Sequence, residues 1–253
     1  MGQDESSGNC KGGGLVERIP LLDEVRGFAV LAMVGYHLLW DLEGLPWAAA
    51  LLGHPAMGAA RNLFAGLFAA AAGGCCLLSR NNWRRGGLCL LAAEAVSMAA
   101  GVIGVSIRFG VLHLLGTSMV LAAWTMPVLE KIPARWGFWG AVGVVLLTAG
   151  LPQGRFLWMA LPEWEGWSGA LYPLGIWGGR VPAADYFPLL PWGGVFFGGF
   201  FAGKKIMARG IPPFAMKRRS RFLAACGRNT LWIYLLHQPV LMGALLLFGY
   251  SAR

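Results

Sequence analysis

The chain has 253 residues, of which 57% are hydrophobic and 13% charged, and its formal net charge is +9. Soluble globular domains typically carry ~25% charged residues, so this composition argues against a soluble enzyme. The positive charge does not imply nucleic-acid binding, because membrane proteins gather Lys and Arg in cytoplasmic loops. Since the apolar runs are continuous rather than alternating, they predict an all-α polytopic transmembrane helix bundle rather than a β-barrel.

The chain divides into a tail and one membrane domain. Residues 1–18 are polar and Gly-rich, lack the apolar segment of a signal peptide, and are predicted to form a disordered cytoplasmic tail. Residues 19–250 form a single transmembrane domain with about seven spans, expected at 22–41, 58–78, 86–105, 109–127, 136–151, 188–202 and 226–248. Residues 43–55 are expected to be a short loop. The stretch 169–179 is too short to span and is interpreted as interfacial or re-entrant; if it crossed with its flanks, there would be eight spans.

The basic residues predict the orientation. With the N-terminus in the cytoplasm, most of the 21 Lys and Arg residues fall on the cytoplasmic side, as the positive-inside rule requires. We therefore expect a multi-pass protein of the cell inner (cytoplasmic) membrane, with a cytoplasmic N-terminus.

The first span carries four ionisable residues: Asp23, Arg26, His37 and Asp41. At 3.6 residues per turn they share one stripe, about 60° wide. Ionisable groups inside a membrane are costly unless paired or hydrated, and they usually mark functional sites. A catalytic or binding stripe is favoured, and a structural polar seam between helices is the alternative. His37 and Asp41 are four residues apart, close enough to hydrogen-bond.

Three further polar residues lie at helix ends or inside spans. His113, at the outer start of the fourth span, is a candidate second base or acceptor-binding group; a hydrogen bond to Thr117 is the alternative. Asp185 is a candidate acceptor-binding residue, or a cap of the helix that follows it. His237 lies beside Pro239, which removes a helical hydrogen bond; helix packing is favoured for it, and substrate binding is its candidate functional role.

Five stretches together resemble a known family. They are LDEVRGFAVLAMVGYHLLWDL, RNLFAGLFAAAAGG, FGVLHLLGTS, DYFPLLPWGGVFFGGFFAGK and GRNTLWIYLLHQPV. Their order resembles bacterial relatives of heparan-α-glucosaminide N-acetyltransferase, and the spacing of Arg26 and His37 resembles the wider acyltransferase-3 group, whose first-helix histidine is thought catalytic. The resemblance implies that residues 19–250 form a transmembrane acyltransferase domain. It would move an acetyl or other acyl group from cytoplasmic acyl-CoA to a sugar or glycan acceptor at the outer face.

These considerations assign a role to each candidate. His37 is the expected general base, because a neutral imidazole with a pKa near ~6.5 suits that task, and Asp41 would orient it. Whether the acyl group passes directly or through an acyl-histidine stays open. Arg26, with Asp23 beside it, is the candidate donor-binding group, although pairing with Asp23 alone is an equal alternative. His113 joins His37 and Asp41 as a catalytic candidate, and Asp185 and His237 are the candidate acceptor-binding residues.

The sequence also bears on cofactors and partners. Acetyl-CoA or another acyl-CoA is the expected donor, and no metal signature is present. The lipid bilayer and a glycan or amino-sugar acceptor are the expected partners, without nucleic acid; a homodimer is left open. A non-enzymatic transporter or flippase for a glycan or lipid carrier is the alternative function, because a polar stripe could also serve as a conduit.

Overall fold

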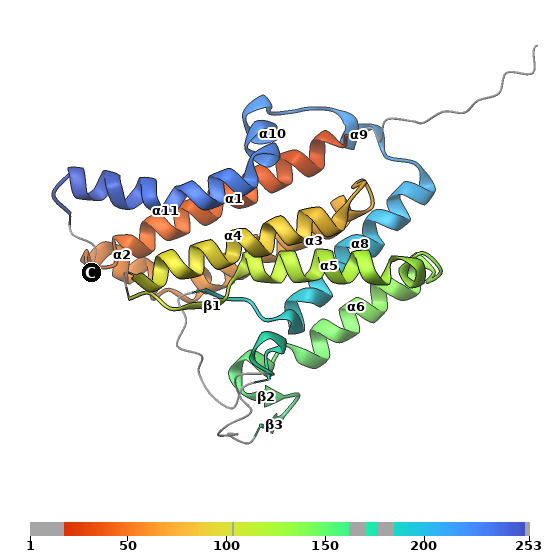
Figure 1. The fold of residues 1–253 in the computed structure, drawn as a ribbon, viewed down its shortest axis with the longest axis horizontal. Helices are drawn as coiled ribbons and strands as arrows, with labels where there is room; N and C mark the ends of the chain where they lie inside the picture. The colour runs from red at the N-terminus through yellow and green to blue at the C-terminus, as the bar shows by residue number, and fades with distance from the viewer. Residues whose placement is uncertain (1–17, 103, 162–170, 177–184, 251–253) are drawn as a thin grey trace, which may run out of the picture.

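A computed structural model describes residues 18–102, 104–161, 171–176 and 185–250 (Figure 1). The fold is dominated by helices: α1 Pro20–Asp41, α2 Pro46–Leu52, α3 Pro55–Cys76, α4 Asn82–Val102, α5 Val111–Leu129, α6 Ala134–Thr148, α8 Leu189–Arg209, α9 Pro213–Met216, α10 Arg221–Arg228 and α11 Thr230–Leu247. Short 3-10 turns lie at Leu151–Gln153 and Tyr172–Leu174. The strands are β1 Ile107–Phe109, β2 Arg155–Phe156, β3 Met159–Ala160 and β4 Asp185–Tyr186. The predicted helical class is thus confirmed.

Five helices in the described part of the chain are long and apolar enough to cross a membrane: α3, α4, α5, α6 with its 3-10 extension to Gln153, and α11. Helices α1 and α8 have similar lengths, 22 and 21 residues, but α1 carries the polar stripe and α8 ends with several basic residues. The predicted tail lies outside the described residues except for Arg18, and of the stretch 169–179 only residues 171–176 are described.

The expected loop at 43–55 instead contains helix α2. This prediction was wrong because Pro46 was interpreted as a loop residue, whereas it occupies the first turn of α2. Proline suits that position, since the first N–H of a helix has no intrahelical partner. Pro55 starts α3 in the same way, and His54 Nδ1 accepts the Ala56 N–H at 3.2 Å.

Glycines allow α8 to pack closely against α3. A Cβ on Gly73 would overlap the Phe196 carbonyl oxygen, and one on Gly199 would overlap that of Ala70. Glycine permits this close approach because it has no side chain at the contact. Phe196 and Phe200 are fully buried beside this contact and anchor the core.

The start of α1 is fixed against α10 in a similar way. Gly27 faces the Leu223 carbonyl and Gly227 faces the Asp23 carbonyl, each too closely for a Cβ. The buried carboxylate of Glu24 accepts the backbone N–H groups of Arg219 and Ser220 at 2.6 and 2.9 Å. These contacts join the turn before α10 to α1, and Figure 1 shows α10 beside the first half of α1.

A short parallel pairing positions the loop before α8. Ile107 and Phe109 of β1 lie opposite Asp185 and Tyr186 of β4, and Phe187 N donates to Phe109 O at 2.8 Å. Because β1 leads directly into α5, this pairing brings Asp185 to the N-terminus of α5.

Candidate active site

The polar stripe of α1 faces α11. Arg26 Nη2 donates to Thr230 Oγ1 at 2.8 Å, and the His37 and His237 rings lie with centroids 5.0 Å apart. Near the end of α1, the Asp41 carboxylate accepts from Gln238. Because the partners follow the same order in both helices, α1 and α11 run parallel. The stripe therefore lies along the contact between α1 and α11, and two of its residues, Arg26 and His37, also line pockets.

The first pocket, which we call the arginine pocket, is lined by Arg26, Arg85 and Arg228. Apolar side chains complete its wall: Phe68, Leu88, Leu112, Leu115, Met119 and Leu231. Tyr234 and Thr230 of α11 also line it. A cationic rim with an apolar wall fits an anionic molecule that carries an uncharged arm.

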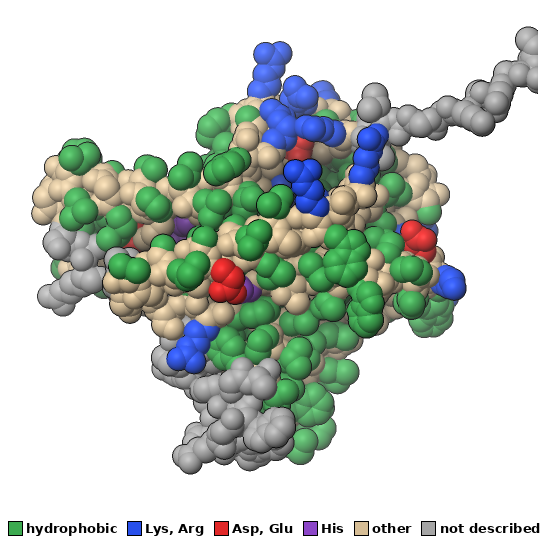
Figure 2. Space-filling view, in the orientation of Figure 1, with side chains coloured by type: hydrophobic (Ala, Val, Ile, Leu, Met, Phe, Trp, Pro, Cys, Tyr) green, Lys and Arg blue, Asp and Glu red, His purple; other side chains and the backbone are tan. Residues whose placement is uncertain are grey.

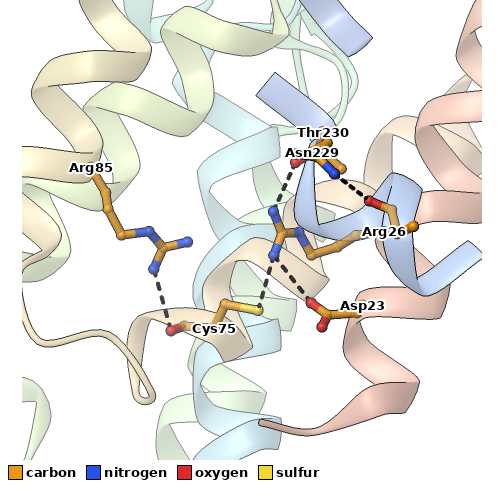
Figure 3. A network of polar contacts seen from close by, with 7 residues as sticks. Asp23, Arg26, Cys75, Arg85, Asn229 and Thr230 are labelled. Atoms are coloured by element: carbon orange, nitrogen blue, oxygen red, sulfur yellow. Dashed lines mark hydrogen bonds and ion pairs between the residues drawn. The ribbon is translucent and has the colours of Figure 1, made fainter. Parts of the chain in front are cut away.

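Arg26 is fixed in this pocket by several partners (Figure 3). Besides Thr230, its guanidinium lies 3.8 Å from Asp23 Oδ1 and 4.0 Å from Cys75 Sγ. Arg85 Nη1 donates to the Cys75 carbonyl at 3.5 Å, so the two arginines approach the pocket from opposite sides of Cys75. Asp23, a predicted donor-binding residue, contacts Arg26 and is not among the pocket-lining residues.

The second pocket, which we call the histidine pocket, is lined by Tyr36, His37, Arg61 and Asp185. Its remaining wall is apolar, formed by Ala29, Met33, Phe64, Ala65, Phe68, Val111 and Phe187. Two of the predicted site residues, His37 and Asp185, therefore share one pocket. The Arg61 guanidinium lies 5.5 Å above the Phe187 ring.

The two pockets share a wall. Phe68 lines both, and Tyr234 Oη of the arginine pocket donates to Asp185 Oδ2 of the histidine pocket at 3.3 Å. Arg26 and His37 lie 11 residues apart on α1, roughly 16 Å along its axis. A linear molecule reaching from the arginines past Tyr234 would therefore present its far end to the second pocket.

His37 is partly buried and is not joined to Asp41 by a hydrogen bond in the described structure. Asp41 instead accepts the Gln238 amide at 2.8 and 3.0 Å. The neighbour of His37 is His237, whose Nδ1 lies 2.6 Å from the Tyr234 carbonyl. Since that carbonyl can only accept, Nδ1 carries the proton, and Nε2 is a buried acceptor without a partner among the described residues.

His113 uses both ring nitrogens elsewhere. Nδ1 accepts the Gly110 N–H at 3.3 Å, and Nε2 lies 3.3 Å from Glu94 Oε1. The partner considered from the sequence, Thr117, is thus replaced by Gly110, and His113 stabilises the start of α5. Its role as a second base stays a prediction, and it is not among the residues that line the histidine pocket.

Asp185 caps α5 and not, as considered, the helix that follows it. Its Oδ2 accepts the Val111 N–H at 3.1 Å, and Gly110 permits this approach because a Cβ there would overlap the same oxygen. Burial raises the pKa of the Asp185 carboxyl, while Val111, Tyr234 and the charges of Arg61 and His113 oppose the rise. The carboxylate faces the α5 N-terminus, which favours negative charge.

Sequence reasoning missed several residues of the site. Arg85, Arg228, Thr230 and Tyr234 line the arginine pocket, and Arg61 lines the histidine pocket. Most of them lie inside the five family-like stretches, so that resemblance was the signal that could have found them. Among the described residues no three His, Cys, Asp or Glu side chains are grouped to hold a metal ion.

The fold and the site define a helical membrane protein with an arginine-rimmed pocket and a histidine-containing pocket on either side of one wall. Residues 18–239 match the family model described as heparan-alpha-glucosaminide N-acetyltransferase, catalytic, and the chain belongs to that family. Membership indicates an acetyltransferase-type function in a membrane protein. No curated protein and no solved structure matches the chain significantly.

Proposed function

We propose that this protein is an integral membrane acyltransferase. It moves an acetyl or other acyl group from cytoplasmic acyl-CoA to a sugar or glycan acceptor at the outer face, with His37 as the general base. The observation that carries the proposal is the shared wall: the arginine and histidine pockets meet at Phe68 and at the hydrogen bond between Tyr234 and Asp185. Donor and acceptor could thus enter from opposite sides and meet there.

The arginine pocket suits the donor. CoA carries several phosphate charges followed by a long, uncharged pantetheine arm, and arginine binds phosphate through several N–H groups at once. Arg26, Arg85 and Arg228 would hold the phosphates, while the leucines and Met119 would contact the arm. Asp23 would position Arg26, a role consistent with its predicted place at the donor site.

The histidine pocket suits the acceptor. An amine or hydroxyl must lose a proton as it attacks the thioester carbonyl, and His37 lines the pocket where that group would arrive. The carbon–sulfur bond breaks as the new carbon–nitrogen or carbon–oxygen bond forms, and CoA leaves as the thiol. Asp185 would bind the polar groups of the acceptor, and His237 would hold His37 in place.

The proposal includes seven spans and an N-terminus in the cytoplasm, with α1 and α8 added to the five apolar helices. A reporter active only in the cytoplasm should work when fused after Arg85 or Arg219 and fail after Arg253. Cytoplasmic activity after Arg253 would place the C-terminus in the cytoplasm. It would contradict the seven-span topology that puts the histidine pocket at the outer face.

The decisive test is acyl transfer in proteoliposomes. Radiolabelled acetyl-CoA is supplied on the side of the arginine pocket, and a panel of amino-sugar acceptors on the other. We expect label in the acceptor with wild-type protein. If the acceptor crossed the membrane unmodified when no acetyl-CoA was supplied, the protein would instead be a transporter or flippase.

Donor binding can be measured separately. Arg26→Ala and Arg85→Ala each remove charge-assisted hydrogen bonds worth roughly 1.5–3 kcal/mol, so CoA should bind about 10- to 100-fold more weakly. Arg84→Ala is the matched control, because Arg84 is exposed beside Arg85 but does not line the pocket. Equal CoA affinity in all three variants would remove the donor from this pocket.

A further inference from the structure

A second group of cations lies outside both pockets. Lys217, Arg218, Arg219 and Arg221 follow one another around the start of α10, and all four are exposed. We call them the basic face. Figure 2 shows Lys and Arg side chains gathered over α9, α10 and the start of α1. None of the four lines the arginine pocket, so the proposed donor does not account for them.

Acidic side chains of the described structure do not neutralise the basic face. None of its side chains forms an ion pair within the described residues, and the sequence contains no Asp or Glu after Asp185. The neighbouring acid, Glu24, is buried, and its Oε1 is engaged by the backbone N–H groups of Arg219 and Ser220. Four positive charges therefore face outward, where an anionic partner can reach them.

Two aromatic side chains distinguish between anionic partners. Phe214 and Phe222 flank the basic face and are 58% and 65% exposed. Inorganic phosphate would bind the cations and leave both rings in water. The surface of a phospholipid bilayer offers both partners, because headgroups carry the anionic charge and the acyl boundary just beneath them accepts apolar rings.

The basic face is also held in a fixed position. The glycine contacts of Gly27 and Gly227 and the carboxylate of Glu24 fasten α10 to the start of α1. Helix α11 begins directly after α10. The basic face therefore lies where two helices of the bundle begin, at the depth expected for headgroups if those helices cross the membrane.

We propose that the basic face binds anionic phospholipid headgroups, with Phe214 and Phe222 inserted at the acyl boundary. Clusters of Lys and Arg beside a transmembrane helix bind anionic lipids with about 1 kcal/mol per residue. The contact is a docking surface separate from the acyltransferase site and does not depend on the proposed activity.

The test uses the full-length protein in nanodiscs of phosphatidylcholine mixed with phosphatidylglycerol. Native mass spectrometry counts the lipids of each class that stay bound, and hydrogen exchange reports on residues 213–228. We expect phosphatidylglycerol to be retained selectively, and exchange in this segment to slow when it is present. Raised salt should weaken the preference, because exposed charges are screened.

Two double variants separate this surface from general positive charge. Arg218→Ser with Arg221→Ser should reduce the preference about 30-fold, the effect of two charges at about 1 kcal/mol each. Lys131→Ser with Arg135→Ser removes the same charge from two exposed residues, one between α5 and α6 and one in the first turn of α6. Arg135 already lies over Trp136, and this variant should change the preference little. Phe222→Ser should weaken retention, whereas Phe222→Trp should preserve it.

The outcomes are distinct from those for the acyltransferase. Equal retention of both lipid classes by a folded wild-type protein overturns the proposal, as does an equal effect of the two double variants. If the Arg218 and Arg221 variant bound CoA more weakly but retained lipid normally, the basic face would belong to the donor site. A variant that loses transfer activity through the acyltransferase site should retain as many phosphatidylglycerol molecules as the wild type.

Discussion

Tyr234 Oη donates to Asp185 Oδ2 over 3.3 Å, and this hydrogen bond crosses the wall between the arginine pocket and the histidine pocket. The two residues come from α11 and β4, 49 positions apart in the chain. An acyl group passing from one pocket to the other would travel beside this bond. The Tyr234 hydroxyl has one proton, so it can donate to the thioester carbonyl oxygen, where negative charge develops during attack, only when it releases Asp185.

Tyr234→Phe tests this role, since it removes one hydroxyl and keeps the ring. Loss of an oxyanion donor typically costs about 10²–10³-fold in rate, and we expect a decrease approaching that range with CoA affinity nearly unchanged. Tyr186→Phe is the control, because its hydroxyl donates to the Tyr172 carbonyl and the residue lines neither pocket. If both variants transferred acyl groups at the wild-type rate, Tyr234 would be only a packing residue.

Asp185→Asn should separate stability from activity. Because burial raises the pKa of this carboxyl, the folded protein holds the proton more tightly than the unfolded chain, whose carboxyl has a pKa near ~3.9. Stability is therefore greatest below the unfolded pKa and falls as pH rises through the folded pKa. The amide removes that dependence, so at neutral pH the variant should be at least as stable as the wild type, while transfer falls.

The measurement is the melting temperature of both proteins across a pH series, alongside the transfer rate. Glu43→Gln removes an acid that is exposed between α1 and α2 and should change neither quantity. A wild-type protein whose stability rises from acidic to neutral pH relative to Asp185→Asn would contradict the prediction. It would mean that the partners of Asp185 outweigh its burial.

The sequence predicted the stripe of α1 and the presence of most helices because these depend on local periodicity and hydropathy. It did not predict the partners of the stripe. Thr230, His237 and Gln238 meet α1 only because α11 packs parallel to it, and nothing local to either segment specifies that register. Asp41 illustrates the point. Its spacing from His37 favoured a hydrogen bond between the two, yet in the folded protein its carboxylate accepts a hydrogen bond from Gln238.

The capping role of Asp185 was equally beyond local reasoning. The sequence offered the following helix as the natural target, because caps usually act on the residues directly after them. The pairing of β1 with β4 carries the carboxylate to α5 instead. Strands of two or three residues leave no periodic pattern to detect, so a contact that depends on them appears only in three dimensions.

Gly227→Ala should loosen the attachment of α10 to α1. The added methyl group would overlap the Asp23 carbonyl. Such overpacking typically lowers the free energy of unfolding by about 1–3 kcal/mol. Gly243→Ala is a matched control in α11, where a Cβ would meet no heavy atom within 4 Å. Gly243→Ala should leave the stability unchanged or raise it slightly, since alanine favours the helical conformation over glycine. Thermal unfolding in detergent distinguishes the two variants, and equal melting temperatures would contradict the close contact.

The histidine pair supports the most direct test of mechanism. If His37 is the general base, His37→Ala should cut transfer by about 10²–10⁴-fold and leave CoA affinity nearly intact, because the proposed donor contacts lie around Arg26. His237 does not line the histidine pocket, but its ring centroid lies 5.0 Å from that of His37, and its Nε2 has no partner among the described residues. We propose that this nitrogen accepts a ring N–H of His37 when that ring turns toward it. His237→Leu should therefore slow transfer less than His37→Ala does.

A conservative variant shows whether position 237 acts through that acceptor. The carbonyl oxygen of His237→Gln can take the place of Nε2, so this variant should recover much of the rate that His237→Leu loses, and its pH profile should stay close to that of the wild type. His54→Asn, which replaces an exposed cap of α3 with another capping residue, controls for the loss of a histidine. A well-folded His37→Ala protein that transferred at the normal rate would remove His37 from the mechanism. His113 would then be the next residue to test, although both of its ring nitrogens already have partners.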